Sequence, residues 1–298
     1  MKVKDVYFNG GVALDAAERG SGPFIWRFTV LERVLHAVLA IAFFVLAYTG
    51  LPLRFSCVAW APAMMTLWGG APTAGLIHRW AAGVVLGCFA VYAAWAVAAL
   101  ARAKDRRRLL TGPDSILLQR SDFVEFWGML KWSVGRGPKP RLGRFTYRER
   151  FSYLVTFLGL GVIAASGLLL WFPEWFGRFL PGYWFNVATV IHSYNVMLLA
   201  ALIVTYHFVD VHLRPNKLPL DGVMFTGRAT FQYMREEHPL VADAIGDPRL
   251  QEPSPRVVKD RVAPPPPQWM RRAHVAVGMV ALALGALLLG LSLWDALC

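Results

Sequence analysis

Five long apolar segments dominate the sequence and constrain what it can fold into. They cover residues 30–53, 75–100, 151–172, 187–210 and 273–295, and each contains few charges. About 20 apolar residues in a helix cross the roughly 30 Å hydrocarbon core of a bilayer, so each segment is long enough to span a membrane. We therefore predict an all-α integral membrane protein, a four-helix bundle with an additional fifth transmembrane helix.

The distribution of positive charge predicts the orientation of these spans. Residues 101–150 contain 13 Lys and Arg and residues 213–272 contain 10, whereas the connections 54–74 and 173–187 contain one each, Arg54 and Arg178. Loops rich in Lys and Arg stay in the cytoplasm. We expect a cytoplasmic N-terminus, two long cytoplasmic connections and a C-terminus on the outer side. The net charge of +12 thus reflects topology and a lipid bilayer, with no nucleic-acid partner.

Five regions follow from this pattern. They are an N-terminal cytoplasmic segment (1–29), a four-helix core (30–212), a cytoplasmic connection inside that core (about 101–150), a Pro-rich cytoplasmic loop (213–270) and a C-terminal transmembrane helix (271–298). In the connection, apolar residues recur at helical spacing over 115–134. This pattern indicates an amphipathic helix that lies on the inner membrane surface or packs on a soluble partner subunit.

A hidden duplication relates the first helix pair of the core to the second. Residues 27–33 read RFTVLER, and residues 144–150, at an offset of 117, read RFTYRER. At the same offset Thr49-Gly50 matches Ser166-Gly167, whereas His36 corresponds to Tyr153. Cofactors often sit between the halves of such repeats.

Four histidines lie inside the spans at two depths. His36 and His207 lie toward the cytoplasmic end, and His78 and His192 toward the outer end. His192 and His207 share one span, and 15 helical residues would separate them by roughly 22 Å along the axis, within about 60° of one face. Polar residues inside spans are expensive and are functional candidates.

Paired imidazoles at matched depth suit the two axial positions of a haem iron, which then carries electrons and has no open position. We therefore predict two haems b, an inner one on His36 and His207 and an outer one on His78 and His192. The alternatives are a histidine-based proton-coupled transporter and a non-redox membrane anchor. Covalent c-type attachment is excluded because the three cysteines form no C-x-x-C-H motif.

Cations near the ends of the spans are candidates for haem propionates. Arg27 and Arg33 suit the inner haem and Arg79 the outer one, although each is equally explained as a snorkelling anchor. Of the other histidines, His212 and His274 leave open a third haem at the inner surface, and His238 is expected to be solvated in its polar loop.

These residues resemble a known family. Arg27-Phe28-Thr29, Glu32-Arg33 and His36, then Thr49-Gly50, Ile77-His78, Ile191-His192-Ser193 and His207, are similar to motifs of the membrane di-haem cytochromes b. That family includes the gamma subunits of formate dehydrogenases and the cytochrome b subunits of nickel–iron hydrogenases and thiosulfate reductase. The resemblance covers about residues 25–212 and implies that the same four histidines ligate two haems.

The resemblance also implies a function. Such proteins are subunits of respiratory complexes in the bacterial inner membrane, and they pass electrons between a quinone pool, menaquinone or ubiquinone, and a periplasmic multihaem cytochrome c or iron–sulfur subunit. Their quinone site lies near the inner haem, at the start of span three and the end of span four. The candidates here for quinone binding and proton relay are Thr146, Glu149, Tyr153, Asp210 and His212, and this stretch departs from the formate dehydrogenase form.

Overall fold

The computed structural model describes residues 24–113, 115–214, 217–218, 220–246 and 262–297. In this part of the chain five helices are long and apolar enough to cross a membrane, which confirms the predicted spans and the all-α membrane fold. The five spans are α1 (Val30–Arg54), α3 (Ala71–Arg102), α6 (Tyr147–Trp171), α8 (Tyr183–Ala201) with the π-helical turns η3 (Leu202–His207) and η4 (Val209–Leu213), and α12 (Gln268–Leu297).

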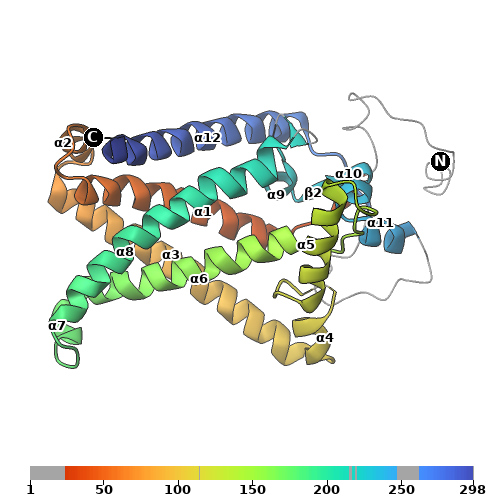
Figure 1. Cartoon of the computed structure of the whole chain (residues 1–298), viewed down its shortest axis with the longest axis horizontal. Coiled ribbons are helices and arrows are strands. Elements are labelled where there is room, and N and C mark those ends of the chain that lie inside the picture. The colour runs from red at the N-terminus through yellow and green to blue at the C-terminus, as the bar shows by residue number, and fades with distance from the viewer. Residues whose placement is uncertain (1–23, 114, 215–216, 219, 247–261, 298) are drawn as a thin grey trace.

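The spans lie side by side along the length of the molecule as two helix pairs and a fifth helix (Figure 1). The main contacts of α1 are with α3, and those of α6 are with α8. The duplicated sequence starts both pairs in the same way. Thr29 and Thr146 are the N-caps of α1 and α6, and each forms a capping box with the glutamate three residues later. Such reciprocal bonds satisfy backbone donors that a helix start would otherwise leave free.

Large apolar side chains face outward along the spans. Ile41, Val84 and Leu158, for example, are each about half exposed or more, at 66%, 45% and 57%. In water this surface would be costly, whereas in lipid only the backbone polar groups must be satisfied internally, as helices do. The outward-facing surface therefore fits a hydrocarbon solvent.

The fifth span is packed onto the core. Leu288 of α12 is fully buried in a cluster with Tyr48 and Leu51 of α1 and with Val204 and Phe208 of the fourth span. The Tyr48 hydroxyl also donates a hydrogen bond of 2.6 Å to the carbonyl of Leu284. Because an apolar cluster and a partly buried hydrogen bond both join it to α1, α12 belongs to the same bundle.

Short elements close the two ends of the bundle. The helices α2 (Trp60–Leu67) and α7 (Pro173–Phe176) lie at one end, with the C-terminal end of α12 (Figure 1). The opposite end carries α4 (Arg106–Thr111), α5 (Arg120–Ser133), α9 (Val223–Thr226), α10 (Phe231–Glu237) and α11 (Pro239–Gly246).

A small antiparallel sheet ties distant segments together at that second end. Its order is β2-β1-β3, from β1 (Phe24–Trp26), β2 (Arg228–Thr230) and β3 (Val262–Ala263), with Phe24 opposite both Thr230 and Ala263. Ile25 and Ala229 are buried in a cluster with Met234. The region 213–270, expected to be a polar loop, therefore folds in its described part into a compact cap that includes the end of the N-terminal segment.

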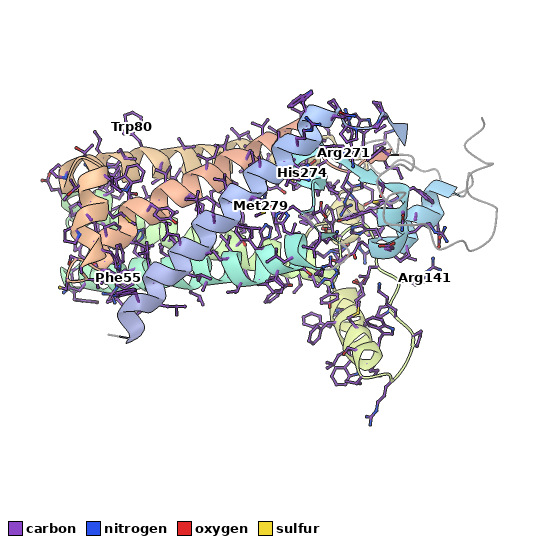
Figure 2. All side chains as sticks on the ribbon, turned by 90° about the horizontal axis from the view of Figure 1, so that it is seen from above. Phe55, Trp80, Arg141, Arg271, His274 and Met279 are labelled. Carbon is purple, nitrogen blue, oxygen red and sulfur yellow. The ribbon has the colours of Figure 1, made fainter. Side chains whose placement is uncertain are left out.

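The amphipathic helix α5 stands out sideways from the bundle, on the same side as the labelled Arg141 (Figure 2). Its apolar side chains at helical spacing are exposed, including Phe123 at 66% and Trp127 at 55%. On its other side Asp122 is buried against Arg150 of α6 in an ion pair of 2.7 Å. The buried ion pair thus anchors α5 to α6, while the aromatic face of α5 is exposed.

Candidate functional site

The four intramembrane histidines form two pairs in the structure. The rings of His78, from α3, and His192, from α8, have their centres 6.3 Å apart with an interplanar angle of 68°. The rings of His36, from α1, and His207, from η3, also have their centres 6.3 Å apart, at 39°. We call these the outer pair and the inner pair. Each pair joins one helix of the first half of the core to the fourth span.

The rings of the outer pair are held by hydrogen bonds at duplicated positions. Nδ1 of His78 lies 2.9 Å from Oγ1 of Thr49. Nδ1 of His192 lies 3.2 Å from Oγ of Ser166 and 3.0 Å from the carbonyl of Ile163. Because Nδ1 carries these contacts, Nε2 of each ring is the nitrogen left for a ligand.

Glycines at duplicated positions let these rings approach the helices behind them. A Cβ on Gly50 would lie 3.1 Å from Cε1 of His78, and a Cβ on Gly167 would lie 3.0 Å from Cε1 of His192. Ordinary contacts of a Cβ fall at 3.4–4 Å. The Thr49-Gly50 and Ser166-Gly167 dipeptides therefore form the surface against which each ring of the outer pair packs.

The inner pair is packed among aromatic rings. The His207 ring lies 6.3 Å from that of Phe208 and 6.4 Å from that of His212, centre to centre. His212 therefore stands beside the inner pair, toward the C-terminal end of the same span. Its Nδ1 is buried with no hydrogen-bond partner among the described residues.

The π-helical turns of the fourth span place the inner histidine. The span is α-helical through Ala201, and residues Leu202–His207 and Val209–Leu213 then form wider turns. A π-turn accommodates an extra residue in a helix and often marks a functional site. The regular helix assumed from the 15-residue spacing was therefore wrong, although both histidines still meet partners.

Both pairs fit a haem iron between the rings. A metal–imidazole bond of about 2.0 Å to the near nitrogen of each ring would set the ring centres roughly 6 Å apart, as observed in both pairs. For the outer pair, the hydrogen bonds to Nδ1 also leave Nε2 available. Ligating histidines in metal sites are typically oriented by such bonds from the other ring nitrogen.

The predicted propionate cations have different surroundings. Arg27 is 2% exposed, and its guanidinium donates to the carbonyl of Arg144 and lies 3.3 Å from Glu149. Its Nη1 is buried with no hydrogen-bond partner in the described part of the chain. Arg33 donates two hydrogen bonds to the carbonyl of Phe225 in the cap. Arg27 thus keeps one buried donor free, whereas Arg33 serves as a tether to the cap.

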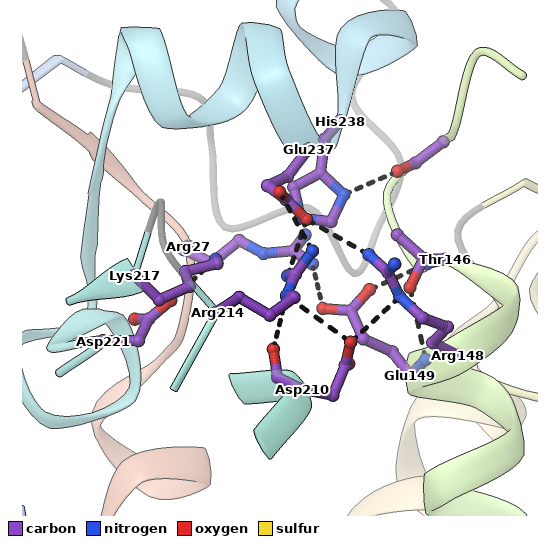
Figure 3. A network of polar contacts seen from close by, with 11 residues as sticks. Arg27, Thr146, Arg148, Glu149, Asp210, Arg214, Lys217, Asp221, Glu237 and His238 are labelled. Atoms are coloured by element: carbon purple, nitrogen blue, oxygen red, sulfur yellow. Dashed lines mark hydrogen bonds and ion pairs between the residues drawn. The ribbon is translucent and has the colours of Figure 1, made fainter. Parts of the chain in front are cut away.

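The residues predicted for quinone binding are only partly brought together. Thr146 and Glu149 meet in the capping box of α6. Asp210 lies beside Glu149 in the network of Figure 3. Tyr153 lies elsewhere, with its ring 6.3 Å from that of Tyr92 and stacked on Phe157.

Two further candidates lie apart from these residues. Arg79, at the other end of the bundle, is exposed. His274 packs against Gly222 and the ring of Phe225, which is 6.3 Å away.

Sequence reasoning missed the ion-pair network at the C-terminal end of the fourth span. Arg148 pairs with Asp210 at 3.2 Å and with Glu237 at 3.3 Å, and Arg214 pairs with Glu237 at 2.9 Å (Figure 3). Hydrogen bonding to Glu237 raises the pKa of Arg214 despite its burial. The network fastens the cap to α6 and to the fourth span, close to the candidate quinone residues.

His238 is a buried part of this region, which corrects the expectation that it is solvated. Its side chain is 1% exposed, and Nδ1 lies 2.8 Å from the carbonyl of Gly143 (Figure 3). Burial and the nearby Arg27 lower the pKa of His238 to about 4, and Glu149 acts in the opposite direction. At neutral pH the ring is therefore uncharged, and its Nδ1–H donates to the carbonyl of Gly143.

Comparison with known proteins agrees with this geometry. The family model described as prokaryotic cytochrome b561 matches residues 27–211, which is more than half of the chain and contains all four paired histidines. No curated protein matches the chain. The family binds b-type haem in the membrane and transfers electrons. The chain therefore belongs to the prokaryotic cytochrome b561 family and is a membrane-embedded, haem-binding electron-transfer protein.

Proposed function

We propose that the chain is a di-haem cytochrome b that carries electrons across a bacterial inner membrane, between a quinone near the inner pair and a redox partner on the outer face. The observation that supports this most directly is the equal separation of the two histidine pairs, 6.3 Å between ring centres in each. A haem with histidine on both sides exchanges electrons and leaves no position for oxygen.

The inner pair is the candidate neighbour of the quinone, menaquinone or ubiquinone. Asp210 and His212 lie on the same span as His207, and Glu149 lies across the network from Asp210. Carboxylates and an imidazole beside a redox centre supply the groups that proton-coupled quinone chemistry needs. Nδ1 of His212 and Nη1 of Arg27 are buried and have no hydrogen-bond partner among the described residues, so a bound group could satisfy them.

The partner on the outer face is proposed to be a multihaem cytochrome c or an iron–sulfur subunit. This choice follows from the resemblance to the membrane di-haem cytochromes b. The outer pair is the pair nearer the end that carries α2 and α7, because α3 and α8 both begin there. The orientation has its own test, because Cys57 is a free, exposed cysteine just before α2. A membrane-impermeant maleimide should label Cys57 from the periplasmic side of intact cells. Labelling only after the inner membrane is opened would show that the protein has the opposite orientation.

Quinol-driven haem reduction tests the proposed function. In proteoliposomes, a quinol should reduce two haems in the wild-type protein and the inner haem alone in a His78→Ala variant. In a His36→Ala variant, the remaining outer haem should no longer be reduced, because the electrons enter beside the inner pair. Thr189→Val, an exposed site on the same bundle, is the matched control and should behave as wild type. Rapid reduction of the outer haem in His36→Ala would contradict the proposal.

A further inference from the structure

The hydroxyl groups that face the outer pair occupy duplicated positions and make duplicated contacts. Thr49 Oγ1 lies 2.6 Å from the carbonyl of Val45 and 2.9 Å from His78 Nδ1. At the offset of 117, Ser166 Oγ lies 2.8 Å from the carbonyl of Val162, and it lies 3.2 Å from Nδ1 of His192. The first helix of each half of the repeat thus carries, toward its far end, a hydroxyl that bridges a backbone carbonyl and an imidazole.

The proton of each hydroxyl is already in use. A Ser or Thr hydroxyl has one proton to donate and two lone pairs. The short contacts to Val45 and Val162 take that proton, since a backbone carbonyl can only accept. Each hydroxyl therefore offers a lone pair to the ring, and the ring nitrogen must be the donor.

A second acceptor leads to the same conclusion for His192. Its Nδ1 lies 3.0 Å from the carbonyl of Ile163, which also can only accept. The proton of the neutral ring is therefore on Nδ1, and Nε2 carries the free lone pair. The tautomer of a ligating histidine is set in this way by the hydrogen bond of its other nitrogen.

We propose that Thr49 and Ser166 are positioning residues of the outer haem site, one supplied by each half of the repeat. They fix the Nδ1–H tautomer and the plane of each outer ring, and they make Nε2 a stronger donor to iron. This inference rests on the proposed function, because it requires a haem between His78 and His192. A more basic ligand favours the ferric state, so these hydroxyls lower the midpoint potential of the outer haem.

The inner pair is built without this device. In the described part of the chain, the His36 and His207 rings face each other, and the rings of Phe208 and His212 lie beside His207. The position equivalent to His36 in the second half is Tyr153, so the inner pair does not come from equivalent positions of the two halves. Changes at Thr49 and Ser166 should therefore act on one haem and leave the other as an internal reference.

Redox titration and electron paramagnetic resonance of the purified holoprotein test the inference. The variants are Thr49→Val and Ser166→Ala, singly and together, with Thr49→Ser and Ser166→Thr as conservative replacements that keep the hydroxyl. Thr189→Val is the control, because Thr189 is exposed and also bonds a carbonyl one turn back, that of Phe185. The outer signal is the one that His78→Ala removes.

Thr49→Val should change the reduction equilibrium of the outer haem about five-fold toward the ferrous state, as expected for one hydrogen bond. Ser166→Ala should change it in the same direction but less, because Nδ1 of His192 still donates to the carbonyl of Ile163. The g-values of that haem should shift with the ring plane, the inner haem should not change, and the conservative variants should restore both readouts. Loss of the outer haem alone, restored by Thr49→Ser, would also support the positioning role. Two haems with unchanged potentials and g-values in the double variant would overturn it. A wild-type protein without two haems would instead overturn the proposed function, on which this inference rests.

Discussion

Replacing Gly167 with alanine should weaken the outer haem site through a single methyl group. The new Cβ would lie 3.0 Å from Cε1 and 3.4 Å from Nδ1 of His192. The ring cannot retreat freely, because Ser166 and the carbonyl of Ile163 both hold Nδ1. Overpacking of this kind costs about 1–3 kcal/mol. With about 1.4 kcal/mol for each factor of ten, the affinity for the outer haem should fall roughly 5- to 150-fold.

The matched control is Gly161→Ala in the same helix, where an added Cβ meets nothing within 4 Å. Both substitutions gain the same helix propensity, about 1 kcal/mol, which acts equally with and without haem and therefore does not alter haem affinity. The assay is the rate of haem transfer from the detergent-purified protein to excess apomyoglobin. Gly167→Ala should release one of its haems faster, and Gly161→Ala should match wild type. Equal release rates for all three proteins would refute the steric reasoning.

Three further predictions concern the end of the bundle that carries the cap. Arg150→Met should lower the free energy of unfolding in mixed detergent by about 3–5 kcal/mol, because Asp122 is left buried and unpaired. As pH falls from about 6.5 to 4, the unfolded chain should protonate His238 before the folded chain does, so stability should fall by up to about 3 kcal/mol and then level off. A spin label at position 130, on the exposed face of α5, should be accessible to oxygen dissolved in lipid.

Each of these predictions has a control. Adding Asp122→Asn to Arg150→Met should recover part of the loss, and strictly additive effects would show that the pair is not coupled. His238→Gln should flatten the stability profile between pH 4 and 6.5, and an unchanged slope would assign it to other groups. A label at Lys131, an exposed cationic site, should report more water than one at 130. Equal lipid exposure at both sites would argue against an interfacial helix.

The spans and their pairing were accessible from the sequence for a physical reason. A run of about 20 apolar residues has few folded solutions in a bilayer, and imidazoles such as His78 and His207 stand out within it. The repeat at offset 117 also predicted that Thr49-Gly50 and Ser166-Gly167 would occupy equivalent positions. In the structure each of these two dipeptides contacts a histidine ring. The role of these histidines as ligands stays a prediction.

The cap and the π-helical turns could not be predicted from the sequence, for different reasons. The pairing of β1 with β2 joins residues about 200 positions apart, and segments this short carry little local signal. The burial of His238 and the ion pairs of Glu237 depend on that fold, so polar composition alone predicted a solvated loop. The widened turns at Leu202–His207 have no composition that distinguishes them from a regular apolar helix.

The haem content of single histidine variants tests the central claim most directly. A pyridine haemochrome assay on the purified protein should give two b-type haems per chain in the wild type. It should give one in His36→Ala, one in His78→Ala and two in His274→Gln, because His274 belongs to neither pair. One haem in the wild type, or loss of the same haem in both His36→Ala and His78→Ala, would contradict the assignment of one haem to each pair.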